Sequence, residues 1–87
     1  MILKMFTVYD SATLAFLPPF FCRSKGEAIR SFTQAVQDES HQFAKHKADY
    51  ASFELGEFDD SSAQVGVQAT PVRVLTALEV GSGTAVS

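Results

Sequence analysis

Cysteine and long apolar runs are both scarce in this sequence of 87 residues. Cys22 is the only cysteine, so the chain cannot form the internal disulfides that hold small secreted domains together. The most apolar window, residues 12–22, contains Pro18-Pro19 and has about half of the roughly 20 residues that a membrane-spanning helix needs. We therefore expect a protein of a reducing compartment that is neither secreted nor inserted in a membrane.

Positive charge is also in short supply. Seven Lys and Arg residues are outnumbered by ten Asp and Glu residues, which gives a net charge of −3. This balance excludes a strongly basic domain, the simplest signature of a nucleic-acid-binding protein. The charge is uneven, however: residues 1–50 carry six basic and five acidic residues (+1), and residues 51–87 carry one basic and five acidic residues (−4). Positive charge is therefore concentrated in the first part of the chain.

The length and composition predict a small globular fold. Hydrophobic residues make up 46% of the chain and charged residues 20%, as in ordered globular proteins. A chain of this length is below the usual size of one domain. We predict a single α+β domain over residues 1–80 and a flexible tail at residues 81–87, where small and polar residues dominate.

Four segments favour β-strands. Residues 2–9 are apolar on both faces, which is typical of a central strand. Residues 15–23 would pair back on it, at an edge or with a bulge, because Pro18-Pro19 cannot donate ladder hydrogen bonds. Residues 52–59 and 65–69 predict two more strands, the last ended by Pro71, and residues 72–80 fit either a strand or a helix.

A helix is predicted between the second and third strands. Ser24 and Glu27 fit a capping box, in which Ser24 accepts from the amide of residue 27 and Glu27 reaches back to the amide of residue 24. Ala28, Ile29, Phe32, Ala35 and Val36 then form one apolar stripe at helical spacing. The helix should end between residues 38 and 40, and residues 41–50 should form a polar connector with short helical character. The predicted fold is α+β: a small antiparallel sheet of about four strands, in the order ββαββ, with one amphipathic helix packed on one face.

No arrangement of residues indicates catalysis or metal binding. Cys22 lies in a predicted strand, where cysteine usually behaves as a small buried hydrophobe. His41 and His46 are five residues apart, a spacing that does not align side chains on a helix, and neither belongs to a zinc-binding motif. We expect no enzyme activity, no catalytic residue, no cofactor and no metal.

Nucleic-acid binding is one reading of the basic residues. Arg23, Lys25 and Arg30 surround the start of the helix, where backbone amides also attract phosphate. Aromatic rings lie close to them in sequence, and stacking rings combined with cations bind single strands. The alternative is an ordinary solvated surface over aromatic core residues. The candidate nucleic-acid-binding residues are Arg23, Lys25, Arg30, Lys45, Lys47, Phe20 and Tyr50.

Self-association is a second expectation. One helix covers only one face of a small sheet, so the other face is left open. Its side chains would be either Phe16, Pro18 and Phe20, or Leu3, Met5 and Tyr9. An exposed apolar face favours a homo-oligomer, and a dimer is the commonest form.

An ordered set of stretches resembles a known family. They are residues 1–11, ending in Val8-Tyr9-Asp10-Ser11; residues 16–21, Phe-Leu-Pro-Pro-Phe-Phe; residues 25–32; residues 41–50, with His41-Gln42-Phe43, His46 and Asp49-Tyr50; and residues 53–59. Together they are similar to the small nonstructural protein of gokushovirus-type microviruses (Microviridae), which are single-stranded-DNA phages.

The resemblance implies a DNA-binding protein that acts in the switch from duplex replication to synthesis and packaging of single-stranded genomes. It implies work in the cytoplasm of the infected bacterial host. The implied partner is single-stranded or viral DNA, or a phage or host replication protein. No catalytic residue follows from it.

Overall fold

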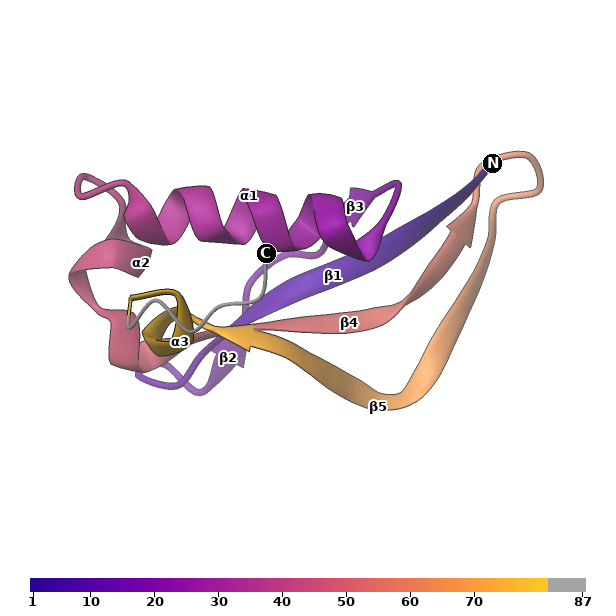
Figure 1. The fold of residues 1–87 in the computed structure, drawn as a ribbon. Helices are drawn as coiled ribbons and strands as arrows, with labels where there is room; N and C mark the ends of the chain where they lie inside the picture. The colour runs from indigo at the N-terminus through magenta and orange to yellow at the C-terminus, as the bar shows by residue number, and fades with distance from the viewer. Residues whose placement is uncertain (82–87) are drawn as a thin grey trace.

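The structure, a computed structural model, describes residues 1–81 and has an α+β architecture with an antiparallel sheet, as the sequence predicts. Figure 1 shows α1 running along one side of the sheet, while the start of β1, the end of β4 and the start of β5 project beyond it as an arm. The elements are β1 (Ile2–Asp10), β2 (Ala15–Phe16), β3 (Phe20–Cys22), α1 (Lys25–Gln37), α2 (Gln42–Lys45), the 3-10 turn η1 (Lys47–Asp49), β4 (Tyr50–Asp59), β5 (Gln64–Thr76) and α3 (Ala77–Gly81).

The element order differs from ββαββ because the predicted second strand is broken in two. The sheet order is β2-β1-β4-β5, and β3 pairs with β1 farther along the edge that β2 also uses. Leu17-Pro18-Pro19 separates β2 from β3, since neither proline has an amide hydrogen to donate. The Thr7 hydroxyl donates to the carbonyl of Leu17 (2.6 Å), and the Leu17 amide donates to the carbonyl of Val8 (2.8 Å), so the interruption stays fixed to β1. The expected edge strand with an irregularity is confirmed.

The prediction that Pro71 ends the last strand is wrong. Val72 pairs with Glu54 and Val67 pairs with Gly56, so residues 68–71 bulge out of the ladder between them. Pro71 lies in this bulge, where no ladder hydrogen bond requires its missing amide hydrogen. β5 therefore continues to Thr76 and leads directly into α3, which includes residue 81. The rest of the predicted tail, residues 82–87, lies outside the described residues.

The capping box of α1 forms with a small difference. The Ser24 hydroxyl oxygen accepts from the amide of Glu27 at 3.1 Å, as expected. The Glu27 carboxylate accepts from the amide of Arg23 at 3.1 Å, one residue before the expected position. The helix ends at Gln37, just before the predicted region. Its start and its stripe are therefore both set by local sequence.

Removing the cap should weaken the helix measurably. Ser24→Ala leaves the amide of Glu27 without its side-chain acceptor, and we expect a loss of about 1 kcal/mol in the free energy of unfolding. Urea denaturation followed by circular dichroism measures it. Ser31→Ala, at an exposed position of the same helix, is the control and should be neutral or slightly stabilising because alanine favours helix. Equal stability of the two variants would contradict a working cap.

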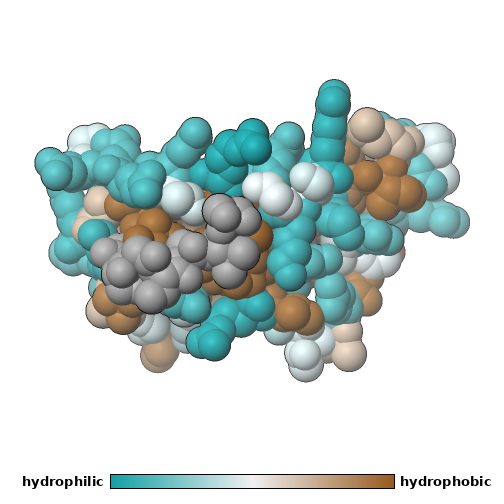
Figure 2. All heavy atoms as spheres, viewed as in Figure 1, coloured by the Kyte–Doolittle hydropathy of each residue, from teal (hydrophilic) through white to brown (hydrophobic). Residues whose placement is uncertain are grey.

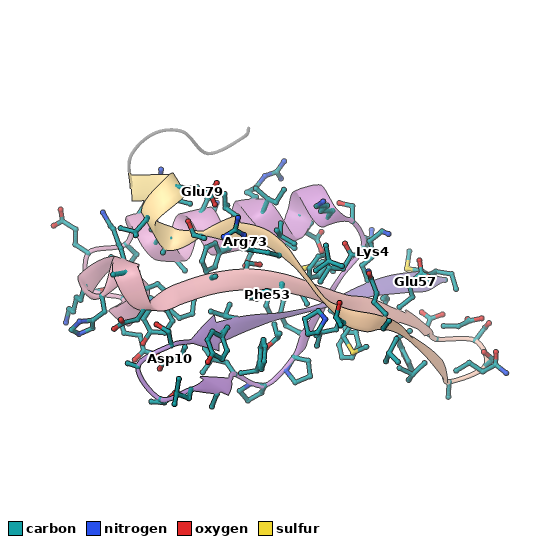
Figure 3. The ribbon with its side chains drawn as sticks, turned by 90° about the horizontal axis from the view of Figure 1, so that it is seen from below. Lys4, Asp10, Phe53, Glu57, Arg73 and Glu79 are labelled. Carbon is teal, nitrogen blue, oxygen red and sulfur yellow. The ribbon has the colours of Figure 1, made fainter. Side chains whose placement is uncertain are left out.

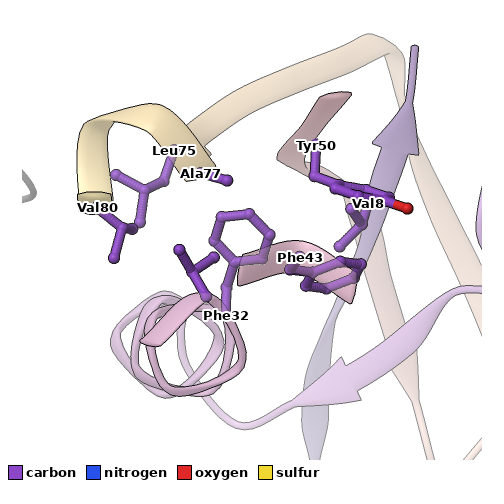
Figure 4. Close-up of a cluster of buried hydrophobic side chains, with 8 residues drawn as sticks. Val8, Phe32, Phe43, Tyr50, Leu75, Ala77 and Val80 are labelled. Atoms are coloured by element: carbon purple, nitrogen blue, oxygen red, sulfur yellow. The ribbon is translucent and has the colours of Figure 1, made fainter. Parts of the chain in front are cut away.

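The core lies between the sheet and the helices. Phe32 of α1, Phe43 of α2 and Val80 of α3 belong to one buried cluster, together with Val8 of β1 and Tyr50 of β4 (Figure 4). The ring centroids of Phe32 and Phe43 are 5.6 Å apart, and those of Phe43 and Tyr50 are 4.5 Å apart. Three helices therefore close the core. The sequence predicted α1 as the single packed helix; α2 lies in the connector that was expected to have short helical character, and α3 fills the remaining end.

Candidate nucleic-acid interface

The predicted basic cluster is divided by the fold. Arg23 and Lys25 lie at the start of α1, whereas Lys45 and Lys47 belong to α2 and η1, which follow its far end (Figure 1). A helix of this length separates the two pairs by about 18 Å. Arg30 lies about 140° round the helix from Lys25, so it faces another direction. All but Lys47 of these five residues are exposed, but they form no single patch.

Two backbone amides near the start of α1 already have side-chain acceptors. The Ser24 hydroxyl and the Glu27 carboxylate accept from the amides of Glu27 and Arg23. A phosphate would have to displace both acceptors to use these donors.

The thiol of Cys22 is not activated. Burial, followed by the nearby charge of Glu27, raises the pKa of the Cys22 thiol, so this buried cysteine remains in its less reactive protonated form.

Two predicted aromatic contacts lie inside the fold. Tyr50 is only 6% exposed and packs against Phe43, so its ring is not accessible for stacking on a base. Phe20 is partly buried and stacks on Phe6 with 6.0 Å between ring centroids. Tyr50 pairs across the sheet with Asp10, which places its ring on the core side. Tyr50 is therefore unavailable for stacking, and Phe20 is only partly accessible.

The accessible aromatic rings lie on the other face of the sheet. Cross-strand partners share a face, and Tyr9 pairs with both Phe16 and Ala51, while Thr7 pairs with Phe53. The centroids of Tyr9 and Phe16 are 4.7 Å apart, and those of Phe16 and Phe53 are 5.7 Å apart. A second group follows along β1, where Phe21 and Phe58 contact each other at 5.6 Å. We call these five rings the aromatic face: Tyr9, Phe16, Phe21, Phe53 and Phe58.

Two rings of the aromatic face are open to solvent. Phe16 and Phe21 are each 49% exposed. Their partners on β1, Tyr9 and Met5, are four residues apart, which places the two rings about 13 Å apart along the strand. Neither ring is among the nucleic-acid-binding residues that the sequence predicts. Strand alternation places Phe20 and Phe21 on opposite faces, so once the core takes Phe20, Phe21 must lie on the other face.

Charge is sparse on the aromatic face. Arg73 lies opposite Phe53 on the neighbouring strand (Figure 3). Among the cross-strand partners of the described strands, Arg73 is the only charged residue on the aromatic face. Hydrogen bonding to Thr76, followed by the nearby charge of Arg73, lowers the pKa of the Glu79 carboxyl. Lys4 instead forms an ion pair with Glu57, with 3.8 Å between Nζ and Oε2. The face is therefore mainly apolar, with Arg23 and Lys25 following β3 at one end.

The remaining polar residues within residues 1–81 provide no candidate metal site. No group of three His, Cys, Asp or Glu side chains in this range is placed to hold a metal ion. His41 has a structural role instead, because its Nδ1 accepts from the amide of Phe43 at 3.1 Å and caps α2. No helix in the described range is long and apolar enough to cross a membrane.

Comparison with known proteins assigns a family. Residues 3–80 match the model of a family described as Phage ORF5 protein, which spans nearly the whole chain. No curated protein and no solved structure matches the chain.

Proposed function

The chain belongs to the Phage ORF5 protein family, and from that premise we propose that it is a non-enzymatic phage protein that binds single-stranded DNA. In this proposal it acts in the cytoplasm of the infected bacterial host. It assists viral genome replication or the switch to synthesis and packaging of single-stranded DNA, as the resemblance to the gokushovirus protein implies.

The observation that carries the proposal is the aromatic face. Half-exposed rings on an antiparallel sheet are the platform on which single-strand-binding proteins stack bases, and stacking accepts any base. Phe16 and Phe21 are separated by about 13 Å, so they offer places for two separate bases. The sparse charge of the face also fits an acidic protein, because stacking needs few cations.

Basic residues at one end of the face supply phosphate contacts. Arg23 follows Phe21 by two residues and Lys25 follows it by four, and both are exposed. Lys45 and Lys47 line a hollow together with Glu39, so their charge is partly balanced there. We therefore assign the phosphate contacts to Arg23 and Lys25. Two contacts of this kind predict weak binding that falls as salt rises.

Alanine substitution of the two exposed rings tests the stacking. Removing one stacked ring costs about 1–3 kcal/mol, so we expect Phe16→Ala and Phe21→Ala each to weaken binding of a fluorescent single-stranded oligothymidine by roughly 5- to 150-fold. Fluorescence anisotropy at low salt measures the affinity. Leu78→Ala, which removes an exposed apolar side chain on α3, is the matched control and should bind as the unaltered protein does. Unchanged binding by the Phe16→Ala, Phe21→Ala double variant would refute the site.

Charge removal tests the phosphate contacts in the same assay. The double variant Arg23→Gln, Lys25→Gln should lower the slope of log affinity against log salt by about 1.4 in magnitude, since each contact on a single strand contributes about 0.7. Lys45→Gln, Lys47→Gln is the matched control and should leave the slope unchanged. If the unaltered protein does not bind the oligonucleotide at low salt, the DNA-binding proposal is refuted.

A second candidate function is favoured by the sparse charge of the aromatic face. Exposed apolar surface is typical of protein–protein contact sites. On this reading the protein is a dimeric interaction module that acts on phage or host replication or assembly proteins without touching DNA. Its partner complex would be lost on Phe16→Ala, Phe21→Ala substitution and would be insensitive to Arg23→Gln, Lys25→Gln substitution.

A further inference from the structure

β5 forms one edge of the sheet. It pairs with β4 on one side, and no other described strand pairs with it on the other. Every residue from Gln64 to Arg73 is exposed. A row of unpaired amide and carbonyl groups at such an edge is a template on which another strand can add.

The first part of this edge, residues 64–67, lacks the charged side chains that usually protect an edge strand. Residues 61–72 contain no charged side chain, although edge strands of monomeric proteins commonly carry lysine or other charges. Val65 is 58% exposed and Val67 is 73% exposed. Farther along, the bulge at residues 68–71 and Pro71 interrupt the strand, which leaves residues 64–67 as the regular stretch. Apolar side chains also gather at the arm in the space-filling view (Figure 2).

We propose that residues 65–67 of β5 pair antiparallel with the same residues of a second copy of the chain, about a two-fold axis at Gly66. This register places Val65 of each copy opposite Val67 of the other, so that apolar side chains meet across the axis. An uncharged strand is complementary to itself, whereas a charged partner strand would gain no ion pair here. The chain as a whole carries a net charge of −3, so an uncharged edge is also where two copies approach with least repulsion.

The neighbouring strands support this register. Val65 pairs with Phe58 on β4, and Phe58 contacts Phe21 on β3 at 5.6 Å. Pairing at Gly66 would continue this apolar row from one copy into the next, and the two sheets would become one with an aromatic face on each half. A Cβ added at Gly66 would meet no atom within 4 Å, so no described side chain crowds this face of the strand at the axis.

Sedimentation over a range of concentrations tests the dimer. The chain has a mass of 9.5 kDa, and we expect a concentration-dependent species of about twice that mass. The double variant Val65→Lys, Val67→Lys should be monomeric while keeping the circular dichroism spectrum of the unaltered protein, because both side chains are exposed. Leu14→Lys, at a side chain that is 77% exposed in the β1–β2 turn, is the matched control and should still dimerise. A monomer at all concentrations, or a dimer of the Val65→Lys, Val67→Lys variant, would overturn the proposal.

A cross-link tests the register. Residue 66 lies opposite its own counterpart in the proposed pairing, and opposed residues of antiparallel strands are within the Cα separation of a disulfide. Oxidised Gly66→Cys protein should therefore form a covalent dimer that reductant reverses. Ser62→Cys, in the β4–β5 turn and four residues from the axis, should remain uncross-linked. Cross-linking through Ser62→Cys but not through Gly66→Cys would refute this register. Neither experiment contains DNA, so each can fail independently of the proposed function.

Discussion

Phe32→Ala is expected to lower the free energy of unfolding by about 3–5 kcal/mol. Phe32 is buried at the centre of the main cluster, where its ring packs against Phe43 from the neighbouring helix. Truncation removes the transfer free energy of the ring and leaves a cavity that the sheet and three helices cannot fill without moving. Natural domains are stable by only about 5–15 kcal/mol, so this loss brings a chain of 87 residues close to unfolding at room temperature.

Urea denaturation followed by circular dichroism measures this loss. Phe16→Ala is the matched control, since it removes the same side chain where half of it is already in water, and it should cost much less. If the Phe32→Ala variant is already unfolded without urea, Phe32→Leu replaces it in the measurement. Leucine keeps most of the side-chain volume. Apart from the apolar area it no longer buries, the change should lower the free energy of unfolding by less than about 1.5 kcal/mol. Equal midpoints for the two alanine variants would show that the cluster is not the centre of the fold.

Gly56→Ala should be the most damaging change outside the cluster, with a loss of about 3 kcal/mol or more. An alanine Cβ at this position would lie 2.0 Å from the carbonyl oxygen of Gly66 and 2.9 Å from the Cα of Val67. Both atoms belong to the backbone of β5, so no side chain can turn away. Gly56 also has φ +157°, which other residues rarely adopt. The added methyl group would therefore force β4 and β5 apart at the point where the arm begins.

Two measurements follow this change. Unfolding in urea gives the total loss, and amide exchange shows whether the arm opens by itself, with faster exchange in residues 56–67 than in α1. Gly26→Ala is the matched control: the added Cβ has only an ordinary contact at 3.9 Å, and alanine favours the helix, so the variant should be slightly more stable. A Gly56→Ala protein as stable as Gly26→Ala would contradict the close approach of the two strands.

Prediction from sequence was most accurate where the signals are local. The cap at Ser24 and the apolar stripe through Phe32 are set by neighbours within a few turns, and α1 forms almost where they indicate. β1 likewise extends only one residue past its predicted end. The proline pair also has a local effect, because each ring removes its own amide hydrogen, and β2 and β3 separate at that point.

Prediction was least accurate where a distant strand decides the outcome. Pro71 is tolerated inside β5 because the hydrogen-bond ladder with β4 skips residues 68–71. No residue near Pro71 in the sequence predicts this shift of register. Residues 72–80 likewise fitted both a strand and a helix. They divide at Thr76, where pairing with Ala51 ends and α3 begins to fill the core beside α1.

The sequence by itself determined the α+β composition, the place of α1 and the scarcity of charge that restricts any DNA-binding surface. Only the tertiary structure decided which aromatic rings are exposed. Strand alternation places neighbours such as Phe20 and Phe21 on opposite faces, but it does not say which face the helices cover. That choice depends on packing between α1 and distant strands. It buries Tyr50 and partly buries Phe20, and it leaves Phe16 and Phe21 open to a ligand.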